Sequence, residues 1–310
     1  VGIIAPRRFA ADARADRLDP GTWARLALAP GGVDSSAGAN DAGGIEIVEI
    51  VPAAIDAARL AGLDAVVLPR PDLINDSGWA RIGLFVGSGG TALVTPPPGV
   101  NVHLWPDAMS RGLGLPTDWT IAREAIAAPE GARLTAAPTS GGDNTAASAG
   151  LLALVEGELD ELLRPVTVRS VLPLDAAGVE SGRTLLKLDS GQTVLWSGRP
   201  VTGGKGTTGR GLGVYLGVAL SLDWSDLPAK PLMVPLMQEI VRQGVGQARG
   251  STWVAAGSRA AAPAGTVELR PVAVRTPAGR TGGPVAEDDA DDGSLSLLGP
   301  GGQSAAPALR

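Results

Sequence analysis

Cysteine is absent from this 310-residue sequence, and histidine occurs only once, as His103. The lack of cysteine excludes disulfides and thiolate metal sites. Thiolates and imidazoles supply most of the nucleophiles and general bases that work near neutral pH. Because few such groups exist here, we expect no catalytic residue set, no metal site and no cofactor, and we expect the chain not to be an enzyme.

Long apolar runs and an excess of positive charge are also missing. The uncharged stretch at 211–222 ends at Asp223 and is shorter than the ~18 residues that a membrane-spanning helix needs. The formal net charge of -6 is opposite in sign to that of a phosphate-binding surface. We therefore expect that this segment does not span a membrane and that nucleic acid is not a partner.

The first third of the chain alternates β-rich runs with helical stretches, a pattern typical of a parallel sheet covered on both faces. Apolar β-rich runs predict strands at 1–5, 45–51, 65–69 and 91–96. Helical stretches are expected at 19–28, 52–61 and 76–86, and in the second of these Pro52 suits the first turn and Gly62 ends the helix. We expect the core to include Trp23, Val48, Ile50, Val66, Val67, Leu93, Val94, Leu186, Val214, Leu216, Leu236 and Ile240.

The rest of the chain is less regular. Weak periodicity predicts an irregular insertion at 106–150, followed by an amphipathic helix at 151–163. Further strands are expected at 166–174, 184–188, 193–197 and 213–220. Ser225 or Asp226 can cap a helix with Pro228 in its first turn and an apolar stripe up to Gly244. We expect a partial β module at 251–275 and a disordered tail at 276–310.

Two glycine-rich segments resemble nucleotide-binding motifs but fit simple turns better. The segment at 87–92 matches G-x-G-x-x-A, yet the helix precedes it and the strand follows it, the reverse of a dinucleotide-binding fingerprint. It therefore predicts a helix end and a turn into a buried strand. The segment at 203–207 fails the spacing of a phosphate-binding loop, which favours a flexible hairpin-like loop.

One candidate ligand site remains, in the crevice beyond the carboxyl ends of the strands. Thr95 follows the fourth expected strand, and His103 lies shortly after it. Lys205 belongs to the glycine-rich loop at 203–209. Open α/β sheets bind ligands beyond the carboxyl ends of their strands. These three residues are therefore the candidate ligand-binding set, although a packed histidine and a flexible loop would also explain them.

Two blocks of sequence resemble a known family. The sequence AVVLP at 65–69, followed by ARIGLFVGSGGTALV at 80–94, resembles a segment of class I glutamine amidotransferase-like domains. The sequences GRGLGVY at 209–215 and SLDWSDLPAKPLMVPLMQE at 221–239 resemble large bacterial membrane proteins related to the Bat-type aerotolerance family. This resemblance implies a doubly wound amidotransferase-like module that faces the periplasm beside membrane helices and a von Willebrand A-type module.

The catalytic residues of that family have no counterparts here. Its amidotransferases use a cysteine after the glycine-rich strand, served by a histidine and a glutamate further along the chain. In this sequence the strand continues into Thr95 and three prolines at 96–98, and no histidine follows His103. The resemblance therefore implies the fold and the cellular location, but not the activity.

Together these observations predict a flavodoxin-like, doubly wound, mostly parallel sheet. We expect its domain to comprise 1–105 and 160–250, interrupted by an insertion and linking helix at 106–159. The expected function is a non-catalytic interaction module with protein partners, on the periplasmic face of the inner membrane and part of a longer chain with an apolar anchor upstream. The alternatives are a degenerate amidotransferase-like hydrolase that uses His103 with Ser88 or Thr95, and small-ligand binding near Thr95, His103 and Lys205.

Overall fold

A computed structural model describes most of the first 248 residues, which belong to the compact unit Val1–Ala264. The described residues are 1–6, 18–30, 44–114, 120–137, 151–152, 155–175, 182–199, 201–202 and 207–248. The expected β module at 251–275 and the expected tail at 276–310 lie outside them, as does Lys205.

Parallel strands form one half of a nine-stranded sheet. Their spatial order is β2-β1-β3-β4-β13, and each pairs in parallel with its neighbour. Every residue of β3, β4 and β13 is buried, as expected for strands covered on both faces. The bounds are β1 Gly2–Ile4, β2 Val48–Ile50, β3 Ala65–Leu68, β4 Thr91–Val94 and β13 Leu212–Leu216.

Antiparallel strands extend the sheet beyond β13 in the order β10-β9-β6-β7. Gly191, with φ of 95°, lies in the turn that joins β9 to β10. The bounds are β6 Ile126–Ala136, β7 Thr167–Val171, β9 Gly182–Leu188 and β10 Thr193–Gly198. Two short antiparallel pairs lie apart from this sheet: β5 Thr120–Ile121 with β8 Leu174–Asp175, and β11 Val201–Thr202 with β12 Thr207–Thr208.

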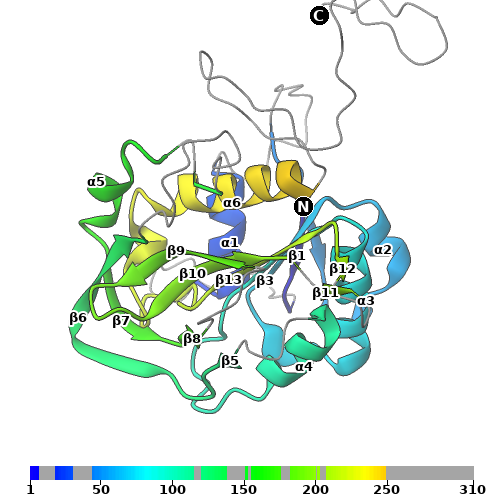
Figure 1. Cartoon of the computed structure of the whole chain (residues 1–310), viewed down its shortest axis with the longest axis horizontal. Helices are drawn as coiled ribbons and strands as arrows, with labels where there is room; N and C mark the ends of the chain where they lie inside the picture. The colour runs from blue at the N-terminus through cyan, green and yellow to red at the C-terminus, as the bar shows by residue number, and fades with distance from the viewer. Residues whose placement is uncertain are drawn as a thin grey trace, which may run out of the picture. The chain divides into compact units, whose positions relative to one another are not determined.

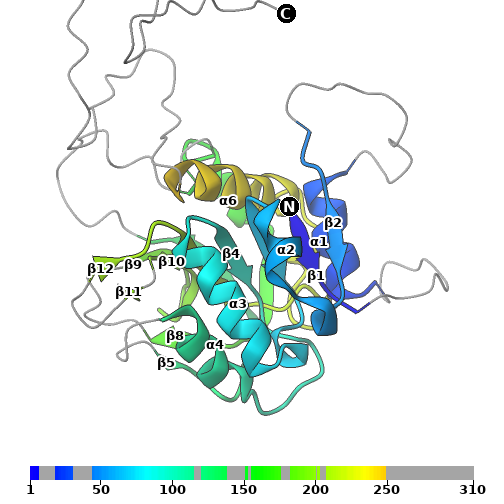
Figure 2. The ribbon, with the colours of Figure 1, turned by 90° about the vertical axis from the view of Figure 1, so that its right-hand side faces the viewer.

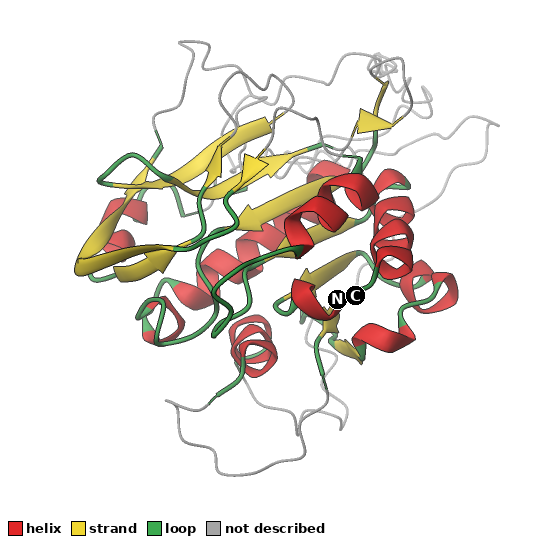
Figure 3. Ribbon diagram, turned by 90° about the horizontal axis from the view of Figure 1, so that it is seen from below, coloured by secondary structure: helices red, strands yellow, loops and turns green. Residues whose placement is uncertain are grey.

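The predicted flavodoxin-like, mostly parallel sheet is wrong. The main sheet is mixed, because half of its strand pairs are antiparallel. Figure 3 shows the strands as one extended layer rather than a sheet enclosed by helices at every strand. The error arose largely at 106–150, where the sequence has too little periodicity to predict helix α4 (Trp105–Leu113) or the long strand β6. The pairing of β6 with β9 and β7 joins distant parts of the chain, so no local sequence pattern predicts it.

Helices cover both faces of the parallel strands. Helix α1 (Pro20–Leu28) packs with α6 (Met233–Ala248) on one face, and α3 (Asp76–Gly87) packs with α4 on the other (Figure 1; Figure 2). Helix α2 (Ala57–Ala61) packs beside α3. These helices fix the positions of the loops at both ends of the parallel strands.

Capping residues account for the helices that the sequence predicted well. The Asp19 carboxylate accepts hydrogen bonds from the N–H groups of Gly21 and Thr22 at 3.0 and 3.2 Å. The Asn75 side chain accepts from Gly78 N–H at 2.8 Å and begins α3. Each cap satisfies backbone donors that the first turn leaves without partners. The predicted helix at 52–61 is instead divided into the 3₁₀ turn η2 (Pro52–Ala54) and α2.

The helix expected to begin near Ser225 begins later. A 3₁₀ turn, η5 (Leu227–Ala229), occupies the predicted first turn, and α6 starts at Met233. The Asp226 carboxylate accepts a hydrogen bond from Thr167 N–H at 2.7 Å, so it joins this turn to β7 instead of capping α6. The predicted helix at 151–163 is also shorter, since α5 spans Leu159–Leu163.

Glycines let α4 lie directly against α3. A Cβ atom added to Gly83 would lie 1.7 Å from the carbonyl oxygen of Gly112. A Cβ atom added to Gly112 would lie 2.7 Å from Cβ of Trp79. This close approach holds α4, and with it Trp105 at its first residue, at a fixed distance from the sheet.

The expected core is buried with one exception. Val48 is 41% exposed, because β2 is the strand at the edge of the sheet, whereas Ile50 on the same strand is 1% exposed. The other predicted core residues all lie within the buried cluster.

Replacing Ile240 by alanine tests this packing. Its side chain on α6 is fully buried, so we expect Ile240→Ala to lower the free energy of unfolding by about 2–5 kcal/mol. Val48→Ala is the matched control, with an expected loss below about 0.5 kcal/mol because the side chain is exposed. Chemical denaturation measures both, and equal losses in the two variants would contradict the assignment of α6 to the core.

Candidate functional site

Thr95 and His103 lie together at the edge of the sheet where the parallel strands end, which we call the C-terminal edge. Thr95 follows β4 directly, and its N–H donates to the Leu68 carbonyl at the end of β3. His103 belongs to the segment between β4 and α4, and both side chains are fully buried. On either side of His103, Val102 and Leu104 are 52% and 68% exposed. The alternation directs the histidine inward.

Aromatic side chains surround the imidazole. The His103 ring makes edge-on contacts with Trp105 and Trp224, each with 6.2 Å between ring centroids. Trp105 also contacts Tyr215, at 6.4 Å. The Tyr215 hydroxyl donates to the carbonyl of Leu172 at 2.7 Å, and burial raises its pKa well above the ordinary value. The phenol is therefore protonated, and the imidazole has aromatic rings on two sides.

The hydrogen bond from Trp105 fixes the tautomer of His103. The indole Nε1–H donates to Nδ1 of His103 at 3.2 Å. An indole nitrogen can only donate, so Nδ1 must be unprotonated and the neutral ring carries its proton on Nε2. Burial lowers the pKa of His103, while the Asp72 carboxylate acts in the opposite direction. At neutral pH His103 is thus an uncharged hydrogen-bond donor.

Three buried polar atoms of this region have no hydrogen-bond partner among the described residues. They are Nε2 of His103, Oγ1 of Thr95 and Oγ of Ser225. Ser225 follows Trp224, whose ring contacts His103. Thr95 follows Val94, which pairs with Tyr215, and the Tyr215 ring contacts Trp105, the residue that donates to His103. Leaving a buried polar group without a partner costs about 1–3 kcal/mol. The arrangement therefore favours occupancy by a molecule that offers hydrogen bonds.

Asp72, whose carboxylate acts on His103, is neutralised by Arg70. Arg70 donates two hydrogen bonds to Asp72, at 2.9 and 2.8 Å, just after β3. That hydrogen bonding raises the pKa of Arg70. Because the pair carries no net charge and His103 is neutral, the cluster presents polar groups without a net charge.

The structure separates Ser88 from this cluster, whereas Lys205 lies outside the described residues. Ser88 ends α3 before β4 begins, at the edge opposite Thr95, and its hydroxyl donates to the Phe85 carbonyl at 2.8 Å. A pairing of His103 with Ser88 is therefore wrong. Strands β11 and β12, which flank Lys205, pair as an antiparallel hairpin. Arg199 and Arg210 lie just outside that hairpin and line a cavity with Gly89 and Gly90, which precede β4.

Ser225 is the site residue that the sequence did not identify. The order of Asp, Trp, Ser and Asp at 223–226 is typical of a helix cap, which explained the hydroxyl locally. Trp224, the residue before it, gave a signal, because a buried tryptophan ring must pack against other side chains. Its contact with His103 arises only in the fold. Hydrolysis with His103 as a base is not supported either, because Nδ1, its one unprotonated nitrogen, already accepts a hydrogen bond from the Trp105 indole N–H.

Comparisons with known proteins give little guidance. No family model matches the chain, and no curated protein matches its sequence. A GH42 beta-galactosidase from G. stearothermophilus is 13% identical over 56% of this chain and 21% of its own, with a TM-score of 0.34. An exo-beta-1,4-mannosidase from Opitutaceae bacterium strain TAV5 is 13% identical over 80% and 35%, with a TM-score of 0.34. The beta-galactosidase from Rahnella sp. R3 is 16% identical over 70% and 28%, with a TM-score of 0.39.

These neighbours correct one prediction. All three are glycosidases by name, and we do not retain the prediction that the chain is not an enzyme. The chain spans at most 35% of the length of any of them. At these TM-scores the likeness assigns neither a fold nor an activity. Within the described residues, no helix is long and apolar enough to cross a membrane, as the sequence predicted.

The tautomer of His103 can be observed directly, because the chain contains no other histidine. We expect long-range proton–nitrogen NMR spectra at neutral pH to show a protonated Nε2 and an unprotonated Nδ1. Replacing Trp105 by phenylalanine removes the indole donor and should allow a mixture of tautomers. A protonated Nδ1 in the unaltered chain would contradict the assignment.

Burial of His103 also predicts a pH dependence of stability. The folded-state pKa lies below the ordinary value of 6.5, so the unfolded chain binds a proton first as the pH falls. Stability should be complete above about pH 6.5 and decrease as the pH falls through the folded-state pKa. In His103→Gln this decrease should be smaller in denaturant titrations between about pH 7.5 and 5.5, since carboxylates titrate lower and the remaining decrease comes from the Val1 amino group, whose pKa burial also lowers. Parallel pH profiles for the two proteins would contradict the prediction.

Proposed function

We propose that this chain is a small-molecule-binding module and that His103, Thr95 and Ser225 form its enclosed binding site. The observation that carries the proposal is the set of three buried polar atoms that have no hydrogen-bond partner among the described residues. Three such groups would together cost about 3–9 kcal/mol. A domain has a net stability of only about 5–15 kcal/mol. A ligand or an ordered water that satisfies these groups removes that cost.

The polar groups of the site define the chemistry of the ligand. His103 offers an N–H donor at Nε2, and the two hydroxyls can donate or accept. A buried carboxylate would need a cation, but Arg70 is already bound by Asp72. We therefore propose an uncharged ligand with a carbonyl or hydroxyl oxygen, whose apolar part packs against Trp105 and Trp224.

The sequence resemblance supports a location for this module. Residues 209–239 resemble the periplasm-facing part of Bat-type membrane proteins, which supports a place in a membrane-anchored assembly at the periplasmic face of the inner membrane. Val102, Leu104 and Ile126 are exposed apolar side chains close to the site, since Val102 pairs with Glu124. We propose that protein partners in that assembly contact this surface.

The test is a thermal-shift screen of uncharged amides, ketones and polyols against the whole chain. A ligand at roughly a hundredfold excess over its Kd should add about 2.7 kcal/mol to the free energy of unfolding. The double variant Thr95→Val with Ser225→Ala removes two of the site's polar groups with little change in shape, and should lose this gain. Ser88→Ala is the matched control, because that hydroxyl lies at the opposite edge.

Two outcomes would overturn the proposal. One is a screen in which no compound raises the Tm, together with a crystal structure that shows only water on the three polar atoms. The other is a ligand that stabilises the double variant as much as the unaltered chain.

A further inference from the structure

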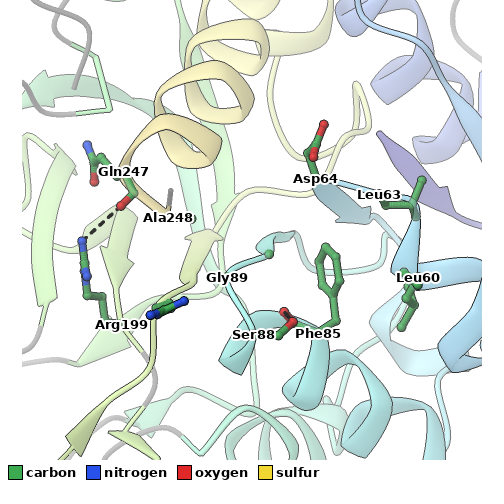
Figure 4. A pocket seen from close by; sticks show the side chains of 12 residues that line it. Leu60, Leu63, Asp64, Phe85, Ser88, Gly89, Arg199, Gln247 and Ala248 are labelled. Atoms are coloured by element: carbon green, nitrogen blue, oxygen red, sulfur yellow. Dashed lines mark hydrogen bonds between the residues drawn. The ribbon is translucent and has the colours of Figure 1, made fainter. Parts of the chain in front are cut away.

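A second site lies at the opposite, N-terminal edge of the parallel strands. An open cavity of about 690 Å³ occupies the space before β3, β4 and β13 and beside the last turn of α6. Figure 4 shows Arg199 on one side of this cavity and Leu60 and Leu63 on the other. Its volume falls within the range of roughly 300–1,000 Å³ that is usual for small-molecule pockets.

Two arginines form the polar side of the cavity. Arg199 follows β10 and Arg210 precedes β13, and the pairing of Gly198 with Gly213 places both at the same end of adjacent strands. Arg199 donates to the carbonyl of Gln247 at the end of α6, at 3.3 Å. Both arginines are exposed, and neither forms a salt bridge within the described residues. Two guanidinium groups that bind no carboxylate of the described residues therefore line the cavity.

The remaining polar groups of the cavity leave few other donors. The hydroxyl proton of Ser88 is directed to the Phe85 carbonyl, so this oxygen can only accept from a ligand. The N–H groups of Gly89 and Gly90 donate to the carbonyls of Val86 and Phe85. An anion in the cavity would consequently be held by the guanidinium groups rather than by the backbone.

The other side of the cavity is apolar and limits the charge of a ligand. Leu60, Leu63 and Phe85 form this apolar wall. Helices α3 and α6 both end at the cavity, and the carboxyl ends of helices carry partial negative charge. Asp64 adds a carboxylate to the lining. A ligand with several negative charges would be repelled, whereas a single carboxylate is matched by the guanidinium groups.

We propose that this cavity binds an amphipathic monocarboxylate. Its carboxylate forms a two-bond pair with Arg210, with Arg199 alongside, since the planar guanidinium matches the geometry of a carboxylate. Its apolar chain lies against Leu60, Leu63 and Phe85. This site is independent of the enclosed site at the C-terminal edge, because the parallel strands separate the two.

Calorimetric titration of the whole chain with hexanoate tests the proposal. Hexanamide has the same apolar chain without the charge, and acetate has the charge without the chain. We expect hexanoate to bind, and both other compounds to bind about tenfold more weakly or not at all. Arg210→Gln should weaken hexanoate binding about tenfold or more, and Arg199→Gln should weaken it less, because Arg199 also contacts α6.

The control variant is Arg111→Gln on α4, which removes an exposed arginine that pairs with Asp76 at the end of α3 opposite the cavity, and it should leave hexanoate binding unchanged. Circular dichroism melts establish that each variant is folded. Equal binding of hexanoate and hexanamide would overturn the role of the arginines, and equal binding of hexanoate and acetate would overturn that of the apolar wall. Equal weakening by Arg111→Gln would show that only the overall charge matters and would also overturn the proposal.

Discussion

The parallel pairing of β4 with β13 is the constraint on which the rest of this structure depends. The two strands come from distant parts of the chain, and every residue in both is buried. Buried backbone groups must find their hydrogen bonds within the sheet, so the register of Leu93 with Val214 is fixed. At Gly211, just before β13, an added Cβ atom would lie 1.9 Å from the Val86 carbonyl oxygen, so only glycine permits this approach.

This pairing separates the two proposed sites, which differ in their chemistry. Because neighbouring parallel strands begin at one edge and end at the other, the residues before β4 and β13 gather at the N-terminal edge and those after them at the C-terminal edge. Arg210 and Gly90 therefore line an open, cationic cavity. Thr95 and Ser225 lie instead at the enclosed, uncharged cluster around His103. A ligand at one edge makes no contact with the other.

The sheet of this protein differs from a doubly wound sheet because it includes the antiparallel strands β10, β9, β6 and β7. They continue from β13, whose outer edge would otherwise expose unpaired backbone groups. They also contribute to both sites: Arg199 follows β10 at the open cavity, and the Tyr215 hydroxyl at the enclosed cluster donates to Leu172, just beyond β7. The extension thus protects the edge of the parallel strands and completes the surroundings of each site.

Local features were determined by the sequence alone. Helices α1 and α3, the apolar run of β3 and the glycine turn after α3 are set by interactions between residues close in the chain, and the sequence predicted each of them. Thr95 and His103 were placed at the correct edge for the same reason.

The sequence could not reveal β6, because a strand with weak periodicity is defined by its partners. Nor could it separate Ser88 from His103, assign Asp226 to β7 or fix the tautomer of His103. Only the tertiary structure decided these, since strand pairing, burial and hydrogen bonding between distant segments depend on which parts of the chain meet.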